Sequence, residues 1–144
     1  MDNTIIIPNI QEFTQQIING NLVLTRIIPF INEATLFKKN LRGSIITECK
    51  INNGNNDIKK YKKLLIYLYS ITNIDTILQH TILNISQQEI YDKGFEYYSQ
   101  LELSIQGADS RRTLKEIINI IKIKNYSIEL KIKFKNDEII NFIM

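Results

Sequence analysis

The chain has 144 residues, a length that suits one folded domain with its own hydrophobic core. Hydrophobic residues make up 44% of it and charged residues 23%, the balance of a soluble globular protein, and the net charge is +3. This composition excludes a disulfide scaffold, a collagen-like chain and a disordered tail. No apolar stretch approaches the roughly 20 residues that cross a bilayer, so a membrane-spanning class is excluded as well.

Three residue types dominate the composition: the chain contains 31 Ile, 16 Asn and 14 Lys, against one Val and two Ala. Codons rich in A and T encode the abundant types. We therefore interpret the bias as that of an A/T-rich bacterial or viral genome and expect isoleucine to be the default core residue. The single cysteine, Cys49, cannot form an internal disulfide, and the N-terminus lacks the basic segment of a signal peptide, so we expect a cytoplasmic protein.

The first part of the chain is expected to contain a helix followed by strands. Asn9 and Glu12 have the spacing of a capping box, which predicts a helix over 10–18. The segments that follow are a predicted strand over 22–28, a stretch over 32–42 that fits a short helix or a twisted strand, a predicted strand over 44–51 and an Asn/Gly-rich loop over 52–56.

The middle of the chain is expected to alternate helix, strand and helix. Asp57 is a suitable N-cap, and apolar residues at helical spacing after it predict a helix over 58–72. Residues 76–85 are expected to form a strand. Ser86 and Glu89 make another capping box, which predicts a helix over 87–99.

The C-terminal part of the chain has the clearest pattern. Alternation predicts a strand over 101–106, and Asp109 caps a helix with apolar residues at i, i+3, i+4 and i+7. Strict alternation over 126–135 predicts a strand that turns at Asn136-Asp137 into a partner strand over 138–143. All 144 residues are therefore expected to form a single α+β domain, with a largely antiparallel sheet, helices packed on one face and a C-terminal strand-helix-strand-strand unit.

The sequence offers few parts for an enzyme. Cys49 and His80 are the single cysteine and histidine. They could form a catalytic pair, but the simpler interpretation is a buried thiol and a half-buried histidine in a strand. Structural zinc needs three or four such ligands and is excluded. The turn at 107–112 has one glycine and places Asp109 at the start of its helix, which favours an ordinary N-cap over a phosphate site. We expect no catalytic residue, metal or cofactor.

A basic cluster surrounds Tyr61 at the start of the helix predicted over 58–72. On a helix its lysines spread round most of a turn, so a solvated face is the first interpretation and nucleic-acid contact the alternative. The chain lacks the domain-wide basic excess that is typical of nucleic-acid binders, and nucleic acid is not the expected partner. The alternative would use Lys59, Lys60, Lys62 and Lys63 with the sheet-face residues Lys131, Lys133 and Lys135.

The helix predicted over 87–99 carries the sharper signal. Its carboxylates recur at i, i+3 and i+7 and so share one stripe, and tyrosines lie on the neighbouring stripe. Such a ridge suits a basic protein partner, because complementary charge speeds encounter and aromatic side chains anchor the complex. A solvated face and a weak divalent-metal site are the alternatives. The predicted partner-binding residues are Glu89, Tyr91, Asp92, Glu96, Tyr98 and Glu102.

From residue 101 the chain reads Leu101-Glu102-Leu103-Ser104-Ile105-Gln106-Gly107-Ala108-Asp109-Ser110, followed by the predicted helix to Lys124 and the hairpin to Met144. This part resembles the C-terminal half of some bacterial immunity proteins, the cytoplasmic antidotes of contact-dependent growth inhibition and related polymorphic toxin systems. The resemblance implies a stoichiometric inhibitor that has no chemistry of its own and blocks the active site of one cognate toxin. It transfers no binding residues. Antidotes to nuclease toxins are commonly acidic, whereas this chain is not.

The leading hypothesis from the sequence is therefore an immunity protein that occludes a toxin with a basic surface. The alternatives are a nucleic-acid-binding or regulatory module, and a viral structural or host-interaction protein from an A/T-rich genome. An exposed last strand, 138–144, would also allow a homodimer, because an open strand edge can pair with a copy of itself.

Overall fold

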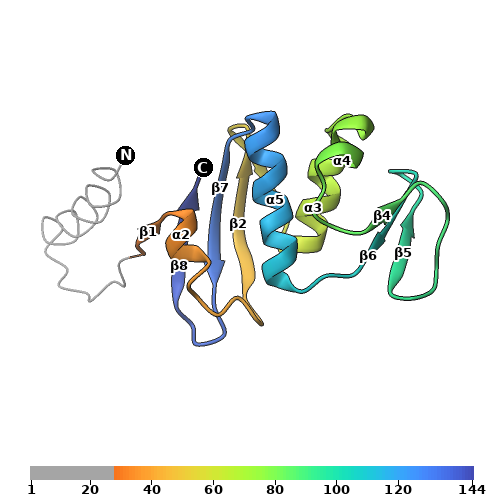
Figure 1. The fold of residues 1–144 in the computed structure, drawn as a ribbon. Coiled ribbons are helices and arrows are strands. Elements are labelled where there is room, and N and C mark those ends of the chain that lie inside the picture. The colour runs from red at the N-terminus through yellow and green to blue at the C-terminus, as the bar shows by residue number, and fades with distance from the viewer. Residues whose placement is uncertain (1–27) are drawn as a thin grey trace, which may run out of the picture.

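The computed structural model describes residues 28–144, which form two β-sheets with a helix layer between them (Figure 1). The helix predicted over 10–18 and nearly all of the strand predicted over 22–28 lie outside the described residues. Helices together with mixed, mostly antiparallel sheets confirm the α+β class.

The larger sheet has five strands in the order β1-β8-β7-β2-β3. Its neighbours are antiparallel except β1 and β8, which run parallel. β2 and β7 contain a register irregularity between Ile46 and Glu48, where β2 bulges. The strands are β1 (Phe30–Ile31), β2 (Ile45–Ile51), β3 (Gly54–Asn56), β7 (Ile128–Lys133) and β8 (Ile139–Ile143).

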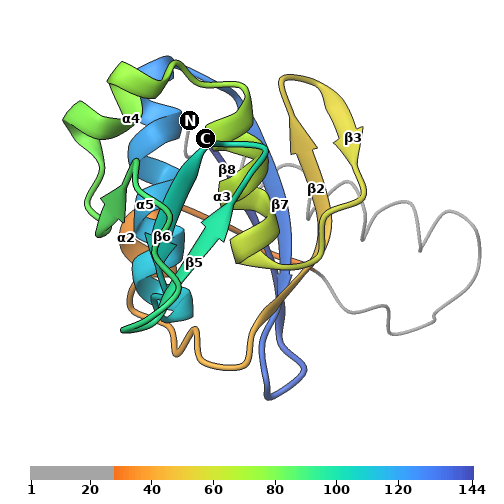
Figure 2. The same cartoon turned by 90° about the vertical axis from the view of Figure 1, so that its right-hand side faces the viewer.

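Two parallel helices, α3 (Tyr61–Ser70) and α5 (Ser110–Lys124), cover one face of this sheet (Figures 1 and 2). β7 shows why: Ile128, Leu130 and Ile132 are buried against the helices, while the residues between them stay half-exposed on the other face. α5 begins where predicted, since Asp109 accepts a hydrogen bond from the Arg112 N–H at 2.8 Å.

The smaller sheet lies on the far side of the helix layer (Figure 2). Its strands are ordered β4-β6-β5, all antiparallel, and Leu103 and Ile105 of β6 join the same hydrophobic core as α3 and α5. These strands are β4 (Ile85–Ser86), β5 (Phe95–Tyr98) and β6 (Leu103–Gln106), and two short helices complete the described fold, α2 (Glu33–Leu36) and α4 (Ile74–His80).

The helix predicted over 87–99 is wrong, because this segment is a loop followed by β5. The Ser86 hydroxyl accepts from the Gln88 N–H at 3.1 Å, so the capping signal closes a local turn and no helix follows. Lys93 and Gly94 then adopt left-handed backbone conformations, with φ of 55° and 81°, which would end any helix. The strand predicted over 76–85 is also wrong.

Helix α4 occupies most of that segment because Asn73 caps it, accepting from the Asp75 N–H at 2.8 Å. The stretch over 32–42 contains the short helix α2. Helix α3 starts at Tyr61 without a side-chain cap, so the prediction of Asp57 as its N-cap is wrong. The loop predicted over 52–56 is instead the turn and second strand of the β2–β3 hairpin.

The C-terminal hairpin differs from its prediction in two details. Its turn has three residues, because the Phe134 N–H pairs with the Glu138 carbonyl and Asp137 takes a left-handed conformation. β8 is also not an open edge: β1 pairs with it at Asn141 and Phe142. The predicted homodimer through this edge therefore loses its structural basis.

Candidate functional site

The six predicted partner-binding residues all lie in the smaller sheet and its loops, but the structure separates them. Successive side chains of a strand point to opposite faces, so Glu96 and Tyr98 face α3 while Tyr97 faces outward. The structure thus divides the predicted ridge into an inner pair and an outer group.

The inner pair, Glu96 and Tyr98, forms contacts within the fold. The Tyr98 hydroxyl donates to Glu96 Oε2 at 2.8 Å, and the Lys62 ammonium from α3 pairs with the same carboxylate. The hydrogen bond from Lys62 lowers the pKa of Glu96, and Tyr98 adds to the effect. Tyr98 is only 9% exposed, so it packs the sheet against α3 and is not accessible to a binding partner.

The outer group is centred on Tyr91, which is 71% exposed. Its hydroxyl donates to Glu89 Oε2 at 2.9 Å, and this hydrogen bond raises the pKa of Tyr91. Its ring meets the ring of Tyr97 edge to face, with centroids 6.1 Å apart. We call Glu89, Tyr91, Asp92 and Tyr97 the small-sheet surface.

Buried Ser104 fixes the loop that carries this surface. Its hydroxyl donates to the Gln88 carbonyl at 2.6 Å and accepts from the Ile90 N–H at 2.9 Å. These two hydrogen bonds hold the loop against the outer face of β6. The Asp92 carbonyl closes the next turn by accepting from the Phe95 N–H at 3.0 Å. Glu102 lies apart from the surface, in the turn between β5 and β6.

Sequence reasoning missed Tyr97, because a helical reading of 87–99 places it away from Tyr91. No alternation of apolar and polar residues marks the strand here, because Phe95, Tyr97 and Tyr98 are all aromatic and only Glu96 is charged.

The structure places Cys49 and His80 in different surroundings. Cys49 faces the core from β2 and is 3% exposed, and burial raises its pKa to about 11. His80 ends α4, is exposed, and its carbonyl accepts a hydrogen bond from Asn119. Residues 28–144 contain no group of three or more His, Cys, Asp or Glu side chains arranged to hold a metal ion.

The Cys49 thiol is therefore expected to be unreactive in the folded protein. With a pKa of about 11, about one thiol in a thousand is ionised at pH 8. Because the folded pKa lies above the unfolded one, this group stabilises the fold fully below pH 9 and progressively less as the pH rises towards 11. The rate of labelling by a thiol reagent, with and without denaturant, checks this; rapid labelling of folded protein at pH 8 would contradict it.

A buried carboxylate joins three helical segments of the core. Glu116 of α5 is 0% exposed and accepts hydrogen bonds from the hydroxyls of Tyr69 and Thr81. It also accepts from Asn119 Nδ2 at 3.0 Å and from the Ile82 N–H at 3.3 Å. Burial and the Glu116 charge raise the pKa of Tyr69, so that hydroxyl stays a donor. The Glu116 carboxylate therefore forms all of these contacts within the fold.

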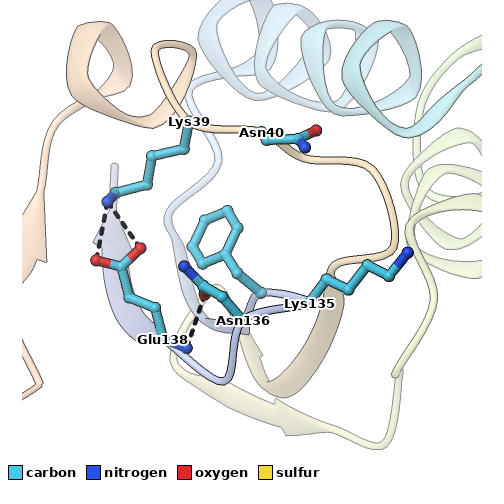
Figure 3. A pocket seen from close by; sticks show the side chains of 6 residues that line it. Lys39, Asn40, Lys135, Asn136 and Glu138 are labelled. Atoms are coloured by element: carbon cyan, nitrogen blue, oxygen red, sulfur yellow. Dashed lines mark hydrogen bonds and ion pairs between the residues drawn. The ribbon is translucent and has the colours of Figure 1, made fainter.

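A hollow of about 560 Å³ with charged side chains in its lining opens beside the C-terminal hairpin (Figure 3). Lys39 Nζ donates to both carboxylate oxygens of Glu138, at 2.9 and 3.0 Å, and stands 5.5 Å above the ring centre of Phe134. Lys135 extends away from this pair on the other side of the hollow. A second hollow shares Lys39 and Asn40 with it, and a third adjoins the second at Ala108 and Ser110.

Comparison with known proteins assigns no family to this chain. No family model matches it, and no curated protein or solved structure shows significant similarity to it. Within the described part of the chain, none of the helices has both the length and the apolar character that a bilayer span requires.

Proposed function

We propose that this protein is an immunity-type inhibitor that binds one cognate toxin and blocks its active site, in the cytoplasm and without a cofactor. The observation that carries the proposal is the small-sheet surface, in which the exposed ring of Tyr91 is held by Glu89 and Tyr97. The resemblance of residues 101–144 to immunity proteins supports the same conclusion.

The geometry of this surface suits protein binding for two physical reasons. A tyrosine fixed before binding loses little side-chain entropy in the complex, so its contact area contributes fully to affinity. The carboxylates of Glu89 and Asp92 beside it attract a basic partner and speed encounter. The expected partner is therefore a toxin domain with a basic surface and a hollow that admits an aromatic side chain.

Replacing Tyr91 by alanine is expected to weaken toxin binding about thirtyfold, the loss typical of an aromatic anchor worth about 2 kcal/mol. Tyr91→Phe keeps the ring and removes only the hydroxyl that meets Glu89, so it should weaken binding by about threefold. Calorimetric titration of the toxin domain encoded by the neighbouring gene measures both. Unchanged affinity of Tyr91→Ala would show that the toxin contacts another surface.

A further inference from the structure

We propose that a basic trough at one end of the molecule binds the phosphate backbone of a nucleic-acid duplex without reading its sequence. The trough consists of three adjoining hollows of about 560, 610 and 220 Å³. The first two share Lys39 and Asn40, and the second and third share Ala108 and Ser110. It runs from the C-terminal hairpin past the start of α5 to the start of α3.

The lining of the trough is strongly cationic. It includes seven Lys or Arg side chains and two carboxylates, an excess of five positive charges, whereas the whole chain has a net charge of +3. The fold thus gathers charge that is dispersed in the sequence. The cations are Lys39, Arg42, Lys59, Lys60, Arg111 and Lys135, together with Lys62, which pairs with Glu96.

The described residues leave much of this charge without an ion-pair partner. Arg42, Lys60 and Lys135 form no ion pair with any residue of the described chain. Both carboxylates in the lining are engaged, since Glu138 holds Lys39 and Asp109 caps α5. A polyanion entering the trough would therefore meet unpaired cations and displace only small counterions.

The character of the lining favours nucleic acid over an acidic protein. Protein interfaces centre on several apolar or aromatic anchors, whereas Ile45 is the one exposed large hydrophobic side chain among the described residues that line the trough, and Lys39 covers the ring of Phe134. Arg111 lies 5.3 Å from the ring centre of Phe37. Interfaces with nucleic acid are more positive than protein interfaces, as this trough is. Since no exposed ring is offered for stacking bases, a duplex backbone fits better than a single strand.

Some of the cations are positioned in advance. Arg111 Nη1 donates to the Phe37 carbonyl at 2.5 Å, and Lys59 Nζ donates to the Thr47 carbonyl at 2.7 Å. These side chains are therefore held at the rim with little loss of freedom on binding. The trough shares no residue with the small-sheet surface, so this inference does not depend on the proposed toxin binding.

Fluorescence anisotropy of the full chain with a labelled duplex of about 16 base pairs tests the proposal. Contact with about four phosphates would lower the affinity roughly hundredfold between 50 and 200 mM salt. The double variant Arg42→Glu/Lys135→Glu should reduce the affinity at least about tenfold. The matched control Lys50→Glu/Lys124→Glu makes the same charge change where β2 and α5 end, away from the trough, and should change it by less than about threefold.

Three results would overturn the proposal. The first is no binding, or binding that is insensitive to salt. The second is an equal loss in the two double variants, which would mean that only net charge matters. The third is stronger binding of polyglutamate or of a single strand than of the duplex, which would assign the trough to an acidic protein or to unpaired nucleic acid. Circular dichroism of both double variants confirms that they fold.

Discussion

Replacing Phe142 by alanine is expected to lower the free energy of unfolding by about 3–5 kcal/mol, the usual effect of truncating a fully buried phenylalanine. Phe142 is 0% exposed in β8 and lies between β7, with which it pairs at Leu130, and β1, with which it pairs at Ile31. The truncation therefore leaves a cavity in the hydrophobic core beside the larger sheet, where the paired strands on both sides limit how far the structure can collapse into it. Urea unfolding followed by circular dichroism measures the loss.

The neighbouring residue provides a matched control. Ile143 belongs to the same strand but is 48% exposed, so Ile143→Ala should cost less than about 1 kcal/mol. Similar losses for the two variants would mean that β8 is not packed between its neighbours as the structure has it.

Replacing Glu116 by alanine is expected to cost about 2–4 kcal/mol, although glutamate is a surface residue in most proteins. The buried hydroxyl of Tyr69 and the half-buried hydroxyl of Thr81 would lose their carboxylate acceptor, and the Ile82 N–H would lose its partner. These groups join α3 and the segment after α4 to α5, so thermal unfolding should show a lower melting temperature with the fold retained.

Glu116→Gln separates the charge from the shape. It keeps the volume and one acceptor oxygen but turns an amide donor towards hydroxyls that already donate, so an intermediate loss is expected. Glu129→Ala, at a half-exposed position on the open face of the sheet, should cost no more than about 0.5 kcal/mol. A Glu116→Ala protein as stable as the Glu129→Ala control would contradict the network.

The C-terminal unit was predictable because its pattern is local. Apolar residues at helical spacing in α5 and strict alternation in β7 each specify one buried face without reference to the rest of the chain. The parallel pairing of β1 with β8 was not predictable, since it joins residues more than a hundred positions apart through two residues of each strand. Helix α4 was predicted as a strand over 76–85, because its cap, Asn73, was not recognised.

The candidate site was predictable in composition but not in geometry. Acidic residues and tyrosines are concentrated at 89–98, as the sequence indicates. Ser86 and Glu89, however, have the spacing of a capping box although no helix follows. The left-handed backbone at Lys93 and Gly94 depends on tertiary packing. The sequence indicated only part of the trough, since its nucleic-acid alternative already included Lys59, Lys60, Lys62 and Lys135. The remaining cations, Lys39, Arg42 and Arg111, come from other segments that only the fold brings together.

The central claim is that the chain is an antidote that works through its small-sheet surface. The most direct test induces the C-terminal region of the protein encoded by the neighbouring gene in cells that express wild-type chain, the variant Glu89→Lys/Asp92→Lys, or the control Glu48→Lys/Glu129→Lys. The control makes the same charge change on the open face of the larger sheet. We expect growth arrest to be relieved by the wild type and the control, with co-purification at a fixed ratio, and not by the variant. Toxicity that no form of the chain relieves, or equal relief by all three, would contradict the account.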